Sequence, residues 1–125
     1  MIAGPYNAGA KTCADREANL LALNQAAYQV FRRGHVPIIG VNLALPVIQA
    51  AGPQMYEAIM MPLSLALTDR CDAILRIEGL SRGADDEVER VQARGGHVYR
   101  SVEEIPNVAD AVEPTEEGVS PHEFP

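Results

Sequence analysis

The sequence predicts a protein of the α/β class, and three observations support that prediction. Short apolar runs alternate with longer segments of helical periodicity, in the order β-α-β-α-β-α-β. The connections are short, as in parallel sheets whose crossovers are helices. Residues 36–41 form a fully apolar run, as expected for a strand buried on both faces. Because such crossovers are right-handed, we expect a doubly wound parallel sheet of four to five strands, a flavodoxin- or Rossmann-like three-layer sandwich.

The first strand and the first helix are predicted close to the start of the chain. Residues 1–3 are apolar and are followed by a Gly-Pro turn signal. Thr12 and Asp15 have capping-box spacing and precede a helix over about residues 14–33. Gly34 follows two arginines, which favours a helix end there. Helical spacing predicts the buried stripe of this helix: Leu20, Leu23, Ala27, Val30 and Phe31.

The middle of the chain is predicted as a strand, a loop and a helical segment. After the strand at 36–41, a loop containing Pro46 and Pro53 is expected over residues 40–53. Apolar residues at helical spacing then predict a helix: Tyr56, Ile59, Met60, Leu63 and Leu67. Pro62 lies within it, so we expect a kink or the start of a second helix there.

The remaining elements are shorter. We expect a strand at 73–77, a loop at 78–83, a helix at 84–94, a strand at 97–99 and a capped turn at 101–105. Val88 and Val91 should face inward. These elements define one domain over residues 1–106, followed by an acidic, proline-containing tail over 107–125 that has too few large apolar residues to order itself.

The charge distribution excludes one class of partner. The net charge of the 125 residues is −7, but residues 101–125 hold seven acids and no base, whereas residues 1–100 hold ten of each. A nucleic-acid-binding surface needs a surplus of Lys and Arg to neutralise phosphates, so we expect no nucleic-acid partner. The neutral body does not repel a small phosphate. The acidic tail would repel it, so we expect residues 107–125 to lie away from any anion site.

Cysteine content and hydropathy bear on the compartment. Cys13 and Cys71 are too few for a disulfide framework, and we expect both as reduced thiols in a cytoplasmic protein. Residues 34–56 lack a formally charged residue but contain three prolines, three glycines and polar amides such as Asn42 and Gln49, so we expect no membrane span. No signal peptide is evident. The histidines lack metal-ligand spacing with the cysteines, so neither a metal nor a cofactor is expected.

Ligands of doubly wound sheets bind beyond the carboxyl ends of the strands. That rule selects the loops at residues 4–12, 40–53 and 78–87. The first of them begins Gly4-Pro5-Tyr6-Asn7, where glycine allows backbone N–H groups to approach a ligand. It is not a dinucleotide-binding fingerprint, and a simple turn is the alternative interpretation.

The third loop carries the chemically most suggestive residues. Ser81 supplies a hydroxyl, Gly83 permits close approach, and the following helix start offers free N–H groups, so together they could cradle a phosphate. We expect Glu87 in the first helical turn, where the dipole would keep its carboxylate ionised and able to attack a sugar carbon. The structural alternative is that acids in a first turn only complement the helix dipole.

Three ordered motifs resemble the nucleoside 2-deoxyribosyltransferase-like superfamily, and most closely its small bacterial members of the DUF4406 type. They are Ile2-Ala3-Gly4-Pro5-Tyr6, the strand entry Cys71-Asp72-Ala73-Ile74, and Ser81-x-Gly83-Ala84-x-x-Glu87. The resemblance covers about residues 1–106. It implies that Glu87 is the nucleophile on the anomeric carbon of a nucleoside or nucleotide, that Ser81 and Gly83 contact a 5′-phosphate, and that Gly4, Pro5 and Tyr6 shape the base and sugar pocket.

One departure from that family weakens the catalytic interpretation. Eight residues before the strand aspartate the family carries a second aspartate, which helps with the leaving base, and here that position is Ser64. The leading hypothesis is an N-glycosidic bond hydrolase or deoxyribosyltransferase, with Asn7 and Asn42 available to bind base or sugar. The alternatives are a non-catalytic nucleotide-binding module on the same fold and a structural oligomer. The family is generally oligomeric, so a homodimer or higher homo-oligomer through the apolar segment 55–67 is also expected.

Overall fold

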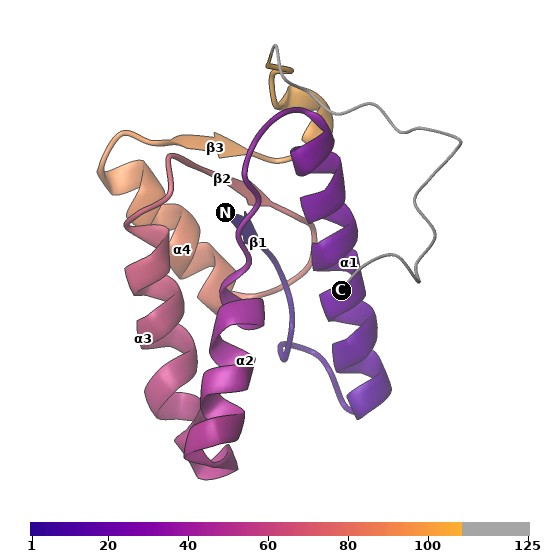
Figure 1. Cartoon of the computed structure of the whole chain (residues 1–125), viewed down its shortest axis with the longest axis vertical. Helices are drawn as coiled ribbons and strands as arrows, with labels where there is room; N and C mark the ends of the chain where they lie inside the picture. Colours follow the sequence, from indigo (N-terminus) through magenta and orange to yellow (C-terminus); the bar gives the residue numbers. More distant parts are fainter. Residues whose placement is uncertain (109–125) are drawn as a thin grey trace, which may run out of the picture.

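The computed structural model describes residues 1–108, and within them it contains three strands and four α-helices (Figure 1). The strands are β1 (Ile2–Ala3), β2 (Ala73–Arg76) and β3 (His97–Tyr99). The helices are α1 (Cys13–Arg32), α2 (Gly40–Ala51), α3 (Tyr56–Thr68) and α4 (Arg82–Ala93), with 3-10 turns η1 (Pro53–Met55) and η2 (Val102–Glu104). The α/β class predicted from the sequence is confirmed.

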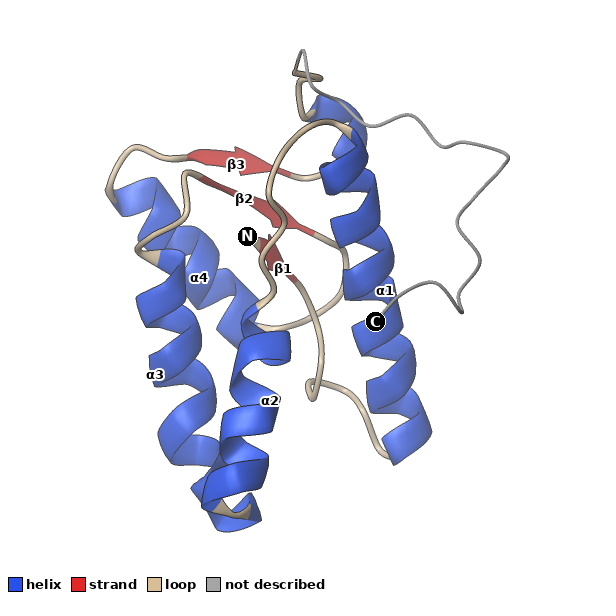
Figure 2. Cartoon of the chain, viewed as in Figure 1, coloured by secondary structure: helices blue, strands red, loops and turns tan. Residues whose placement is uncertain are grey.

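The strands form one parallel sheet in the order β1-β2-β3 (Figure 2). Ile2 lies opposite Leu75, and Ile74 lies opposite Val98. The strand predicted at residues 36–41 is wrong at its end, because Gly40 and Val41 begin helix α2, and none of the three strands of the sheet includes residues 36–39. The backbone is extended at Ile39 and Ile38 O accepts one hydrogen bond from Ile2 N at 2.8 Å, but Gly40 already begins a helix.

The loop predicted over residues 40–53 is also wrong, because most of it is helix α2. Pro46 lies inside this helix. Ala44 and Ile48 fall on one face of α2 and pack against Met60 of α3. This burial outweighs the backbone hydrogen bond that the proline removes. In the same way α3 runs through Pro62 as one helix, so the second helix start considered there does not occur.

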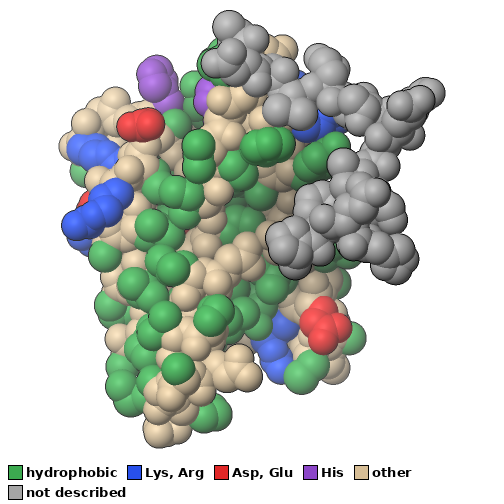
Figure 3. Space-filling model, viewed as in Figure 1, with side chains coloured by type: hydrophobic (Ala, Val, Ile, Leu, Met, Phe, Trp, Pro, Cys, Tyr) green, Lys and Arg blue, Asp and Glu red, His purple; other side chains and the backbone are tan. Residues whose placement is uncertain are grey.

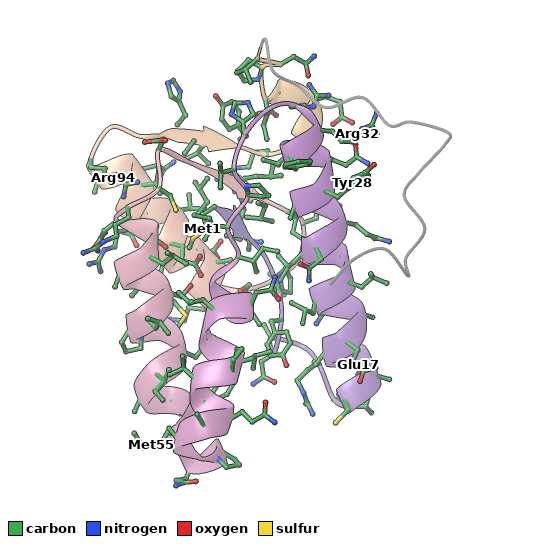
Figure 4. The ribbon with its side chains drawn as sticks, viewed as in Figure 1. Met1, Glu17, Tyr28, Arg32, Met55 and Arg94 are labelled. Carbon is green, nitrogen blue, oxygen red and sulfur yellow. The ribbon has the colours of Figure 1, made fainter. Side chains whose placement is uncertain are left out.

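Helices cover both faces of the sheet. Alternation along β2 turns Ile74 toward Val88 and Val91 of α4 and turns Leu75 toward α1, which contributes Leu23 and Val30. The predicted inward direction of both valines is confirmed. Phe31 was expected in the buried face of α1 but is 47% exposed, whereas the adjacent Val30 is 7% exposed and packs in the core. The α2–α3 pair extends beyond the sheet, with Met55 at its tip (Figure 4).

The ends of α1 follow the sequence signals. Thr12 Oγ1 accepts a hydrogen bond from Asp15 N at 3.1 Å, and the Asp15 carboxylate accepts one from Thr12 N at 3.2 Å, which completes the predicted capping box. Gly34, with φ +91°, follows the helix as predicted. Cys13 and Cys71 are both free thiols.

The last described residues lie against the end of helix α1. Val108 N still donates to Arg33 O at 2.9 Å, which ties the last described residues to the end of α1. The acidic tail was predicted over residues 107–125, and its residues 109–125 lie outside the described residues. Within the described part, none of the helices has the length and apolar character needed to cross a membrane.

Candidate functional site

A cavity of about 240 Å³ lies at the carboxyl ends of β1 and β2. Its wall comes from the loop after β1, the start of α2, the first half of α3 and the start of α4. The lining residues include Gly4, Tyr6, Asn7, Val41, Tyr56, Glu57, Met60, Ser64, Ser81, Arg82, Gly83 and Glu87. This volume is slightly below the range of about 300–1,000 Å³ that is usual for ligand pockets, so a ligand would be enclosed only in part.

Most of the site residues predicted from the sequence meet at this cavity. Gly4, Tyr6 and Asn7 approach it from the first loop, and Ser81, Gly83 and Glu87 approach it from the third. Two predicted residues do not line it. Pro5 belongs to the first loop but does not line the cavity, and it lies next to Gly79 instead. Asn42 donates from Nδ2 to Asn24 Oδ1 at 2.8 Å, which links α2 to α1 instead.

The start of α4 differs from the prediction by two residues. The helix begins at Arg82 rather than at residue 84, because Ser81 acts as its N-cap and Ser81 Oγ accepts a hydrogen bond from Ala84 N at 3.1 Å. Glu87 therefore lies in the second turn and not, as predicted, in the first. The N–H groups of the first turn and the Ser81 hydroxyl form one end of the cavity, and Glu87 lies one turn further along the helix.

Glu87 is the most unusual titratable group of the cavity. Glu87 is buried, with only 8% of the residue exposed. This burial raises the pKa of Glu87 to about 7, and the Ser64 hydroxyl, the Met1 ammonium group and the positive charge of Arg76 oppose the rise only in part. Desolvation therefore opposes the helix dipole, which was expected to keep this carboxylate ionised. Glu87 is poised between its acid and its base form.

Ser64, at the position where a second carboxylate was expected, lies beside Glu87 and is 3% exposed. The start of α2 packs directly against it. A Cβ atom on Gly40 would be 2.0 Å from Ser64 Oγ, so this close approach requires glycine at position 40. Ser64 is thus enclosed between α2 and α4, where its hydroxyl stabilises the ionised form of Glu87.

The sequence interpretation missed Tyr56 and Glu57, two polar residues in the first turn of α3 that line the cavity. Burial raises the pKa of Tyr56, and the neighbouring Tyr6 adds to the rise, so the hydroxyl stays protonated and can donate. Asn19 Nδ2 donates to Tyr6 O at 2.7 Å and fixes the first loop. The only sequence signal for this pair was its place at a helix start that follows a candidate ligand loop.

Two further features bear on what the molecule can bind. A hollow of about 510 Å³ lies at the amino ends of the strands, but none of the predicted site residues lines it. Within residues 1–108 no group of three or more His, Cys, Asp and Glu side chains is arranged to hold a metal ion.

Comparison with protein-family models, with curated proteins and with solved structures finds no match to this chain. The function must therefore be argued from the cavity itself. Its chemistry combines a buried carboxyl group, an anion-compatible helix start and two tyrosine hydroxyls. Such a set can attack a carbon electrophile, bind an anionic group nearby and donate a proton.

Proposed function

We propose that this protein cleaves or transfers the N-glycosidic bond of a nucleoside or nucleoside 5′-monophosphate, with Glu87 as the nucleophile. The observation that carries the proposal is the buried Glu87 carboxyl in a cavity whose other end is the Ser81–Gly83 helix start. A carboxylate and an anion site about one helical turn apart match a substrate with a reactive sugar carbon and a nearby phosphate. The resemblance to the nucleoside 2-deoxyribosyltransferase-like superfamily supports the same assignment.

The proposed reaction has two displacements. A carboxylate oxygen of Glu87 forms a bond to the anomeric carbon while the bond from that carbon to the base nitrogen breaks, and the base leaves with the electron pair. Water, or the nitrogen of a second base, then attacks the same carbon. The ester bond to Glu87 breaks, and the carboxylate is regenerated. The ionised form of Glu87 is the reactive one.

The departing base needs a proton, and Ser64 is a poor source of one at neutral pH. Tyr56 is a better candidate, because it lines the cavity and its raised pKa keeps the hydroxyl protonated. We propose that it assists the leaving base in place of the aspartate that the family carries at the position of Ser64. Tyr6 and Asn7 would contact the base or the sugar from the first loop.

Product analysis tests the proposal. Purified protein is incubated with a panel of nucleosides and 5′-monophosphates, and the free base is quantified by chromatography. We expect base release by wild type and at least a 100-fold slower rate for Glu87→Gln, since this variant has no nucleophile. Glu89→Gln, an exposed acid on the same helix, is the matched control and should keep the wild-type rate. The enzyme proposal fails if no base appears, or if Glu87→Gln retains the full rate.

Ser64 favours a second candidate, a non-catalytic module that binds a nucleotide or another phosphorylated metabolite in the same cavity. Without a second buried carboxylate, this module would hold its ligand by the helix start and the Ser81 hydroxyl alone. It predicts that 5′-monophosphates raise the melting temperature while no base is released. Base release that depends on Glu87 would exclude it.

We also propose that the protein forms a homodimer or higher homo-oligomer through α2 and α3. Residues 40–68 contain only one formally charged side chain, Glu57. Leu43, Val47 and Met55 are 44%, 45% and 38% exposed, and apolar side chains spread over both helices (Figure 3). Light scattering should give a mass above 13.5 kDa for wild type, and Val47→Glu should lower it. A wild-type mass of one chain would reject this assembly.

The finer features of the predicted fold belong to the same proposal. The single hydrogen bond from Ile2 N to Ile38 O supports residues 36–39 as a short fourth strand next to β1. Together with helices on both faces, it would give the doubly wound, flavodoxin-like order. Two free cysteines support a cytoplasmic location.

A further inference from the structure

Arg76 is a buried cation whose contacts all serve one loop. It is the last residue of β2, and it is 8% exposed. Its guanidinium donates from Nη1 to Ile77 O at 2.5 Å and from Nη2 to Gly79 O at 2.8 Å. Nε and Nη2 donate to Asp85 Oδ1 at 3.2 and 3.0 Å. The side chain therefore bonds to both ends of the segment that joins β2 to α4.

The loop is folded around this guanidinium. The carbonyl oxygens of Ile77 and Gly79 both accept hydrogen bonds from the guanidinium, and its positive charge strengthens these bonds. Gly79 has φ +117°, a left-handed conformation that a side chain would strain, and a Cβ atom there would be 2.6 Å from Pro5. Arg76 thus holds together a loop whose path also requires glycine at position 79.

We propose that Arg76 is a positioning residue of the candidate site, which holds the β2–α4 loop so that Ser81 and Gly83 face the cavity. The inference rests on the proposed function only for the identity of the ligand. Ser81 O accepts hydrogen bonds from Asp85 N at 3.0 Å and from Arg76 Nη2 at 3.5 Å. Arg76 therefore contacts the N-cap residue of α4 directly. The N-cap and the first turn of α4 form the end of the cavity where an anion could bind.

The same cation acts electrostatically on Glu87. Its charge opposes the rise in the pKa of that carboxyl group, as the Ser64 hydroxyl and the Met1 ammonium group do more strongly, whereas Asp86 adds to the rise. The two effects are separable by substitution. Lysine keeps the charge but has no planar fork to reach two carbonyls and a carboxylate at once, whereas glutamine loses the charge. A purely fold-stabilising arginine would show no such separation.

Hydrogen exchange on ligand-free protein tests the proposal. Amides 79–84 of Arg76→Lys should exchange about tenfold faster or more than in wild type, while the α1 amides of Leu23 and Val30 keep their rates. Arg90→Lys, which alters an exposed ion pair between α4 and Asp69 at the end of α3, is the matched control and should leave both sets unchanged. Unchanged loop exchange in Arg76→Lys, or equal acceleration in α1, would overturn the proposal.

Two further readouts complete the test. 13C NMR measures the pH at which the Glu87 carboxyl group titrates. This pH should rise in Arg76→Gln and stay at the wild-type value in Arg76→Lys. Equal values in all three proteins would contradict the electrostatic effect of Arg76 on Glu87. Adenosine 5′-monophosphate should bind Arg76→Lys about tenfold more weakly than Arg90→Lys. If wild type binds no nucleotide but the loop amides respond as expected, the proposed function fails and the role of Arg76 in the loop stands.

Discussion

Replacing Glu87 with glutamine should stabilise the protein, and the gain should depend on pH. The pKa of Glu87 is about 7 in the folded protein, against 4.5 for an unperturbed glutamate. The folded state therefore binds more protons than the unfolded state between these two pH values, and the stability of wild type falls as pH rises through that window. A difference of roughly 2.5 units corresponds to about 3 kcal/mol once both states are ionised. Glutamine removes this cost.

Urea unfolding at pH 4 and pH 8 measures the effect. At pH 4 the carboxyl is protonated in both states, so Glu87→Gln should lie within about 0.5 kcal/mol of wild type. At pH 8 the variant should be more stable by about 3 kcal/mol. Glu89→Gln, whose side chain is exposed on the same helix, should show no comparable pH-dependent gain. An equal difference between Glu87→Gln and wild type at both pH values would refute the argument that this carboxyl is buried and desolvated.

Four other predictions follow from the site and the core. If ionised Glu87 is the nucleophile, kcat/KM should rise with pH up to about 7 and then level off, whereas a fall over that range would assign the residue as an acid. Ser64→Asp places a second carboxylate beside Glu87 and overfills the contact with α2. Urea unfolding at pH 8 should therefore show a free energy of unfolding lower than that of wild type by roughly 2 kcal/mol, a larger decrease than at pH 5. Equal decreases at the two pH values would argue against the contact between the two side chains. Thr12→Ala removes the N-cap of α1 and should cost about 1 kcal/mol by thermal or urea unfolding. Leu23→Ala should cost roughly 2–5 kcal/mol, whereas Leu21→Ala, at a position 58% exposed, should cost less than about 1 kcal/mol, and similar losses would contradict the assignment of the core face of α1.

Local signals in the sequence predicted the elements that local interactions define. The capping box at Thr12 and Asp15 and the glycine after α1 marked the limits of that helix within two residues. The apolar run at residues 36–41 was misleading, because its last two residues begin α2. Pro46 reinforced the error, since the packing that carries α2 through the proline involves Met60, which is distant in sequence.

The candidate site divides in the same way. Ser81, Gly83 and Glu87 belong to one short motif, so their meeting at the cavity followed from spacing along one loop and helix. Tyr56 and Glu57 reach the cavity only because α3 packs against α4, which no local pattern reveals. The rise in the pKa of Glu87 was missed for the same reason. The desolvation that causes it comes from surrounding elements, whereas the helix dipole is evident from the position of the residue in the sequence.

Trapping of the glycosyl-enzyme tests the central claim most directly. Wild type is incubated with a 2′-deoxy-2′-fluoro nucleoside or its 5′-monophosphate. The electronegative fluorine slows hydrolysis of the covalent intermediate, so the intermediate accumulates. The tryptic peptide at residues 83–90 is then sequenced by mass spectrometry. That peptide contains four acids, so fragmentation can distinguish Glu87 from Asp85, Asp86 and Glu89. We expect a pentosyl adduct on Glu87 in wild type and none in Glu87→Gln. An adduct on another residue, or no adduct together with no free base from any substrate, would contradict the assignment of Glu87 as the nucleophile.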